Sequence, residues 1–115
     1  MFRVIGCEDF DDEFQRLRRA SMDGNRESAM LVKLIEKGVE KLKYNYRYGQ
    51  HISKYKIQAE YKEKYGVQNL WKINLSSFWR LIYTIHGSET EVVTSILIEV
   101  LDHKKYDRKF GYKTS

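Results

Sequence analysis

The fold is decided by one stretch, which reads Leu70-Trp71-Lys72-Ile73-Asn74-Leu75, then Phe78-Trp79-Arg80-Leu81-Ile82-Tyr83-Thr84-Ile85-His86, then residues 92–101 and Asp102-His103-Lys104-Lys105-Tyr106. Its first two segments alternate apolar and polar residues, and the third is a mainly apolar run. Short polar turns separate them. These patterns predict three consecutive antiparallel strands. We expect the function on the polar face of this sheet.

The apolar positions of the first two strands predict how these strands pair. One alternating set is apolar, namely Trp71, Ile73, Leu75, Trp79, Leu81, Tyr83 and Ile85. If this set points into the core, Leu75 pairs with Trp79 across a three-residue turn, because a slip of one residue would turn the whole set outward. This register places Asn74 opposite Arg80, with Lys72 on the same face.

The third strand extends the prediction to the end of the sheet. Its apolar set is Val92, Ile96, Ile98 and Val100. This set predicts that Ile85 pairs with Val92 around the loop 87–90. Continued to its end, the strand directs His103 to the face of Arg80. We therefore expect a lysine, an arginine and a histidine on one exposed sheet surface, with Tyr106 just beyond it.

The composition limits the class of protein. A chain of 115 residues forms one domain, 1–115, which buries about 65% of its unfolded surface. The single cysteine, Cys7, excludes an internal disulfide, and no metal-ligand spacing is present. No signal peptide and no apolar run of about 18 residues occurs, as a membrane span requires. We expect a cytoplasmic protein without membrane association, metal or small-molecule cofactor.

The positive charge is concentrated in the middle of the chain. The net charge is +5, and residues 26–64 carry ten basic and five acidic side chains. Residues 65–115 carry seven and five. With sixteen aromatic residues in the whole chain, this distribution suits a polyanion such as RNA. The alternative is an ordinary solvated, lysine-rich surface.

The N-terminal half predicts a strand and two helices. Residues 2–7 form the strand. Phe10 and Phe14 recur at helical spacing after Asp9, which suits an N-cap, and a second helix is predicted over residues 26–46. The predicted fold is α+β, with the two N-terminal helices packed on one face of a four-stranded, mainly antiparallel sheet. The other face stays open.

Two segments allow more than one interpretation. Within residues 51–66, the residues Ile52, Tyr55 and Ile57 suit an extended arm, and residues 59–65 suit a short helix that stops at Gly66. The tail, residues 104–113, mixes cations with rings. This mixture suits phosphate contact with base stacking, and equally a frayed, solvated terminus.

Two parts of the chain resemble a known family. The segment 70–75, followed by Trp79-Arg80-Leu81-Ile82-Tyr83, resembles the central strands of the RelE/ParE toxin superfamily, in which an aromatic-basic strand precedes an Arg-[Leu/Val]-[Ile/Val]-Tyr strand. The segment Ile98-Glu99-Val100-Leu101-Asp102-His103-Lys104-Lys105-Tyr106 is similar to the ends of the ribosome-dependent RNase branch, which carries His or Arg after the last strand and a nearby Tyr. The element order also agrees, over nearly the whole chain.

The resemblance implies a RelE-like endoribonuclease toxin of a type II toxin–antitoxin pair. Such an mRNA interferase cleaves mRNA in the ribosomal A site without a metal, and its partners are the ribosome with mRNA and a cognate antitoxin. Arg80 would stabilise the scissile phosphate and His103 would act as general acid or base. Lys72 would support the charge, and Tyr106 would stack on or orient the nucleotide. The expected RNA-binding positions are Asn74, Lys104, Lys105, Arg108 and Lys109.

The residue types suit this chemistry independently of the resemblance. Attack of a 2′-OH on the adjacent phosphorus needs a base, a charge stabiliser and an acid for the departing 5′-oxygen. An arginine clamps two phosphate oxygens and stays charged. A histidine titrates near about 6.5, whereas a lysine needs neighbouring cations to lower its pKa. The alternative is that three cations only keep an exposed sheet face soluble.

Two departures from RelE leave other functions open. Asn74 stands where RelE has a second lysine, and Tyr106 sits a few residues from the tyrosine of that branch. One alternative is a non-catalytic binding module, as in ParE-like members, which bind DNA gyrase; the pair His103 and Tyr106 argues against it. Another is a toxin remnant or regulator of the same fold.

Overall fold

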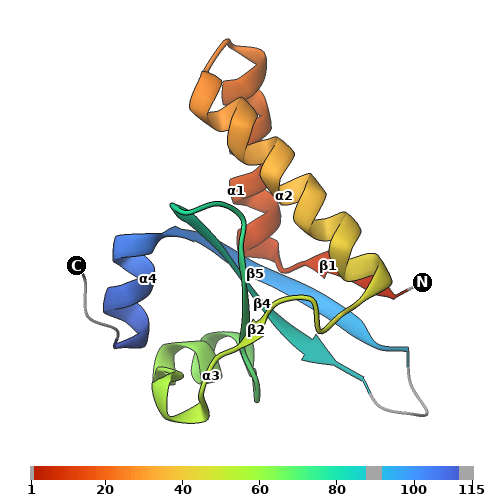
Figure 1. Cartoon of the computed structure of the whole chain (residues 1–115), viewed down its shortest axis with the longest axis vertical. Coiled ribbons are helices and arrows are strands. Elements are labelled where there is room, and N and C mark those ends of the chain that lie inside the picture. The colour runs from red at the N-terminus through yellow and green to blue at the C-terminus, as the bar shows by residue number, and fades with distance from the viewer. Residues whose placement is uncertain (1, 88–91, 112–115) are drawn as a thin grey trace.

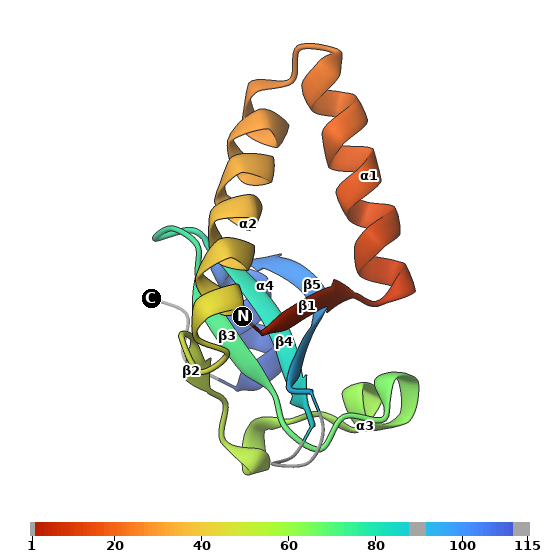
Figure 2. The same ribbon diagram turned by 90° about the vertical axis from the view of Figure 1, so that its right-hand side faces the viewer.

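The structure is a computed structural model that describes residues 2–87 and 92–111. Its elements in chain order are β1 (Arg3–Gly6), α1 (Glu8–Met22), α2 (Arg26–Tyr44), β2 (Gln50–His51), the 3-10 helix η1 (Lys54–Lys56), α3 (Ala59–Tyr65), β3 (Trp71–Asn74), β4 (Trp79–His86), β5 (Thr94–Asp102) and α4 (His103–Phe110). Figure 1 and Figure 2 show α1 and α2 rising from one side of a twisted sheet, with α4 on the opposite side.

The predicted helices form, with small shifts at their ends. α1 begins two residues earlier than the pattern suggests, because Cys7 takes the N-cap position and Asp9 lies inside the first turn. The acidic side chains of that turn complement the helix dipole. In α2 the Asn25 side chain accepts a hydrogen bond from the backbone N–H of Ser28 at 2.8 Å, as an N-cap does. The short helix α3 ends at Gly66, which has the left-handed conformation that glycine adopts most easily.

The sheet has five strands in the order β1-β5-β4-β3-β2, rather than the four that the sequence predicts. The extra strand is β2, whose residues Gln50 and His51 pair with β3. β1 runs parallel to β5, and the other neighbours are antiparallel. The α+β class is confirmed. So is the central register, since Asn74 lies opposite Arg80.

The predicted register of β5 is wrong. Ile85 pairs with Ser95 and not with Val92. The observed partner lies three residues further along the chain, because β5 begins only at Thr94. A β-bulge adds a separate shift of one residue, since Ile82 faces Glu99 whereas Tyr83 faces Leu97, so one residue of β5 is left without an opposite partner. Residues 88–90 of the predicted loop lie outside the described part of the chain.

Both faces of the sheet are covered, so the prediction of one open face is also wrong. The core on the side of α1 and α2 is built from Phe10, Leu31, Ile35, Leu42, Ile73, Leu81, Tyr83 and Leu97. The core on the opposite side is built from Ile52, Ile57, Tyr61, Val67, Leu70, Ile82, Ile98, Leu101, Tyr106 and Phe110. Two segments cover this side: residues 52–67, and the C-terminal tail, which is neither extended nor frayed up to Phe110. It forms α4, whose rings at a spacing of four residues face the sheet.

Candidate nucleic-acid interface

Strands β3 and β4 bring three predicted site residues together. Asn74 pairs with Arg80 across the two strands, and the Lys72 Nζ donates a hydrogen bond to Asn74 Oδ1 at 3.1 Å. These positions share a face because residues two apart on a strand point the same way. The predicted grouping of Lys72, Asn74 and Arg80 is therefore present in the structure.

The guanidinium of Arg80 is held by the turn that precedes it. Its Nη1 donates to the backbone carbonyl of Ser76 at 3.0 Å and to that of Trp79 at 3.3 Å. Its Nε is buried and has no hydrogen-bond partner among the residues that the structure describes. A buried donor without an acceptor costs about 1–3 kcal/mol.

Lys72 is half-buried beside this guanidinium. Burial lowers the pKa of Lys72 below its ordinary value, the positive charge of Arg80 lowers that pKa further, and the Asp107 carboxylate acts in the opposite direction. The Nζ also lies 5.1 Å from the centre of the Tyr106 ring. A lysine with a lowered pKa loses its proton more readily than a lysine with the ordinary value.

The structure places His103 differently from the prediction. Strand β5 ends at Asp102, whose side chain caps α4 by accepting from the Lys105 backbone N–H at 2.9 Å. His103 is thus the first residue of a helix, and strand parity does not direct its side chain. Its ring packs edge-on against Phe78 at 5.0 Å between centroids, and its backbone N–H donates to the Phe78 carbonyl at 2.7 Å. His103 therefore lies against the turn that holds Arg80, with the Phe78 ring as its neighbour.

Tyr106 is a core residue of α4. Only 3% of it is exposed, and its ring packs against Phe110 at 4.9 Å between centroids. The ring therefore offers no open face for the stacking on a nucleotide that the sequence predicts. What it does contact is the Lys72 ammonium, so its place in the site is that of a support for this lysine.

The predicted RNA-binding cations of α4 divide into two groups. Lys104, Lys105 and Arg108 are exposed. Lys109 instead forms ion pairs with Glu99 at 3.3 Å and with Glu60 at 3.6 Å, which neutralise its charge. The helix therefore keeps three of its four predicted cations available to a polyanion.

Sequence reasoning missed the groups that position the site. Ser76 and Phe78 provide the carbonyls that hold Arg80 and His103, and Asp107 acts on Lys72. A signal for α4 was present in the sequence, because an aspartate at position 102 suits an N-cap and two rings follow at a spacing of four residues.

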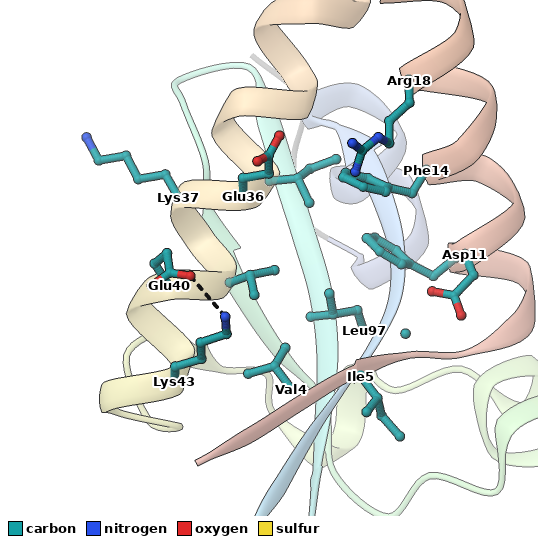
Figure 3. A pocket seen from close by; sticks show the side chains of 14 residues that line it. Val4, Ile5, Asp11, Phe14, Arg18, Glu36, Lys37, Glu40, Lys43 and Leu97 are labelled. Carbon is teal, nitrogen blue, oxygen red and sulfur yellow. Dashed lines mark hydrogen bonds and ion pairs between the residues drawn. The ribbon is translucent and has the colours of Figure 1, made fainter. Parts of the chain in front are cut away.

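A hollow lies on the side of the sheet opposite to the Lys72 and Arg80 side chains, between α1, α2 and β1. It encloses about 480 Å³, and Figure 3 shows Phe14 and Leu97 facing into it while Lys37 points away. Arg18 covers the Phe14 ring at 5.6 Å. Because β1 stands at one end of the sheet order, its outer edge borders this hollow and has the geometry that accepts an extended peptide.

No model of a known family, no curated protein and no solved structure matches this chain. Within residues 2–87 and 92–111, no helix combines the length and apolar character needed to cross a bilayer. The same ranges contain no group of three or more His, Cys, Asp or Glu side chains placed to hold a metal ion. What the protein does must therefore be inferred from the chemistry of its own side chains.

Proposed function

We propose that this protein is a RelE-like, ribosome-associated endoribonuclease toxin that cleaves mRNA without a metal. The observation that carries the proposal is the Arg80 guanidinium, fixed by two backbone carbonyls next to a lysine with a lowered pKa. The sequence motifs of residues 70–83 and 98–106 support it. So does the placement of α1 and α2 on one side of a mainly antiparallel sheet (Figure 1).

The reaction proposed is an internal transfer of the phosphodiester. The 2′-oxygen attacks the adjacent phosphorus as its proton leaves, the bond to the 5′-oxygen breaks, and that oxygen takes up a proton. The products are a 2′,3′-cyclic phosphate and a free 5′-OH. Arg80 binds the phosphate oxygens through its free N–H groups and stabilises their charge in the transition state. Lys72 and His103 are the candidates for the two proton transfers.

Tyr106 has a different role in this proposal from the one that the resemblance implies. Its ring contacts the Lys72 ammonium and thereby positions this lysine. Asn74 fixes the same ammonium through its Oδ1. The exposed cations Lys104, Lys105 and Arg108 neutralise flanking phosphates. The cellular partners proposed are the ribosome with mRNA and a cognate antitoxin.

Induced expression tests the proposal. The wild-type protein is expected to arrest growth, and Arg80→Ala to relieve the arrest. Arg19→Ala is the matched control, because it removes an exposed arginine from the last turn of α1. Cleaved mRNA recovered from ribosomes should carry the cyclic phosphate end. Equal growth of cells that express wild type and Arg80→Ala, with both proteins folded by circular dichroism, would refute cleavage.

The hollow between α1, α2 and β1 favours a second candidate, a binding module of the same fold that does not cut RNA. Its apolar floor and the edge of β1 suit an extended segment of a partner protein (Figure 3). Such a module, if it acted like ParE on gyrase, would leave mRNA intact and alter DNA supercoiling. Translation and supercoiling assays on the same purified protein separate the two candidates.

A further inference from the structure

Two long segments of the chain, residues 41–59 and 64–88, lack acidic residues, and the first of them also gathers cations and rings. Over residues 41–56, which we call the tyrosine strip, cations alternate with rings: Lys41, Lys43, Tyr44, Tyr46, Arg47, Tyr48, His51, Lys54, Tyr55 and Lys56. A solvated helix face normally carries both signs of charge, so this bias needs an explanation.

The tyrosine strip follows a single path along one edge of the sheet. It begins at the end of α2, passes through the loop 45–49 and β2, and ends at η1. In Figure 2 this path is the yellow to yellow-green ribbon that descends beside β3. Because β2 is the last strand in the sheet order, the strip ends at the edge of the sheet, where its Ile52 packs into the core that α4 covers.

Three rings of the strip face solvent. Tyr55 is 100% exposed, Tyr44 71% and Tyr48 48%. Large rings exposed along one segment of the surface are typical of a binding site. Cations accompany the rings, since the Lys41 Nζ lies 5.9 Å from the centre of the Tyr48 ring.

The cations of the strip are largely available. Lys43 is paired with Glu40 at 3.0 Å. For Lys41, Arg47 and Lys54, by contrast, the described part of the chain provides no carboxylate within ion-pair distance. Their charge is therefore free to attract phosphates.

The loop in the middle of the strip, residues 46–49, is also fixed before any ligand binds. The buried Tyr83 hydroxyl accepts a hydrogen bond from the Gly49 N–H at 3.1 Å and donates one to the Tyr46 carbonyl at 3.0 Å. Gly49 has no alternative here, because a Cβ would lie 2.4 Å from the Lys72 carbonyl oxygen. A surface held in this way loses little conformational entropy on binding.

The strip adjoins the Arg80 site. Lys41, Tyr48 and Asn74 line one small hollow of about 150 Å³. Gln50 pairs with Lys72 across β2 and β3. A polymer chain bound at Lys72 and Asn74 therefore meets the strip on leaving the site.

We infer that the tyrosine strip is a docking surface for single-stranded RNA, separate from the cleavage site. The exposed rings stack on unpaired bases, and the cations between them contact phosphates. An acidic protein partner would use the cations but leaves the rings unexplained. The inference rests on the proposed function for its biological setting, in which the strand held at Arg80 continues onto the strip. RNA binding is nevertheless measured without cleavage.

The test is fluorescence anisotropy with a short dye-labelled single-stranded uridine oligonucleotide at several salt concentrations. Tyr44→Ala combined with Tyr55→Ala should weaken binding at least about tenfold, because two stacking platforms are lost. Arg47→Glu combined with Lys54→Glu should weaken binding and lower the slope of log K against log salt by about 1.4, or about 0.7 for each phosphate contact.

A matched control is available on α1. Arg16→Glu combined with Arg19→Glu changes the net charge by the same amount on the far side of the molecule, and should alter affinity less than about threefold because salt screens distant charges. Equal weakening by the control pair and the strip pair would overturn the inference. So would unchanged affinity of the tyrosine variant, or tighter binding of polyglutamate than of the oligonucleotide. Circular dichroism confirms that each variant is folded.

The inference and the proposed function fail in different ways. Oligonucleotide affinity of the strip variants tests the docking surface, whereas relief of growth arrest by Arg80→Ala tests cleavage. If the strip variants bind as wild type while Arg80→Ala still relieves growth arrest, only the docking surface is refuted. If the strip variants lose binding while wild type never arrests growth, only cleavage is refuted.

Discussion

Replacing Tyr83 with phenylalanine isolates the hydrogen bonds that fix the loop 45–49. The Tyr83 side chain is fully buried, and its ring packs 6.2 Å from Trp71 between centroids. Phenylalanine keeps this packing and removes only the hydroxyl. Both loop contacts are then lost, namely the N–H of Gly49 that donates to the hydroxyl and the Tyr46 carbonyl that accepts from it.

The cost follows from the number of bonds. Each net hydrogen bond contributes about 1 kcal/mol, and a partly buried group left without a partner adds to the loss. We expect the free energy of unfolding to fall by about 2 kcal/mol and Tm by roughly 8 °C. Urea unfolding measures the first and a thermal melt the second. Tyr55→Phe is the control, because its ring is 100% exposed. A loss below about 0.5 kcal/mol in Tyr83→Phe, within the range of ordinary surface substitutions, would refute the anchoring role.

The same hydroxyl makes stability depend on alkaline pH. Burial raises the pKa of Tyr83 to about 12 from its ordinary value of 10.0. Above pH 10 the unfolded chain releases the phenolic proton while the folded protein still holds it, so the free energy of unfolding falls as pH rises. This contribution is complete below about pH 10 and is lost towards pH 12. The stability gap between wild type and Tyr83→Phe should therefore narrow over this interval, and a constant gap would contradict it.

Three further results are expected. Gly49→Ala should lower the free energy of unfolding by about 2 kcal/mol in urea, because its Cβ would meet the Lys72 carbonyl at 2.4 Å; a neutral effect would show that the loop shifts freely. The pKa of Lys72, measured by NMR titration, should lie below its ordinary value and should rise in Arg80→Ala, since a neighbouring positive charge is removed. If the pKa is the same in both proteins, Arg80 does not act on Lys72. Asp102→Ala should cost about 1 kcal/mol through the lost cap of α4, with Asp102→Asn close to wild type; equal losses in both would exclude capping.

The pairing of β3 with β4 was predictable because apolar residues occupy every second position along both strands and so share one face. Trp71 and Ile73 on β3, and Leu81 and Tyr83 on β4, can all point into one core in a single register only. That register alone places Lys72 beside Arg80. The part of the candidate site that lies on these two strands could therefore be predicted from the local sequence pattern.

The last strand was not predictable in the same way. β5 is buried on both faces, so Leu97 and Ile98 are adjacent and both belong to cores. A continuous apolar run does not show which of its residues point to which face of the sheet. It also does not show where a bulge shifts the register. The position of His103 depends on this strand and on where α4 begins. The tyrosine strip was not predictable for another reason: the sequence alone does not show which of its rings face solvent.

The turn between β3 and β4 links two groups of the candidate site through its main chain. Its Ser76 carbonyl accepts from Arg80, its Phe78 carbonyl accepts from the backbone of His103, and the Ser76 hydroxyl accepts from the N–H groups of Phe78 and Trp79. The same turn thus holds the guanidinium of Arg80 and the backbone of His103. A substitution in this turn would therefore disturb the orientation of the Arg80 side chain and the start of α4 together, although the two belong to different elements.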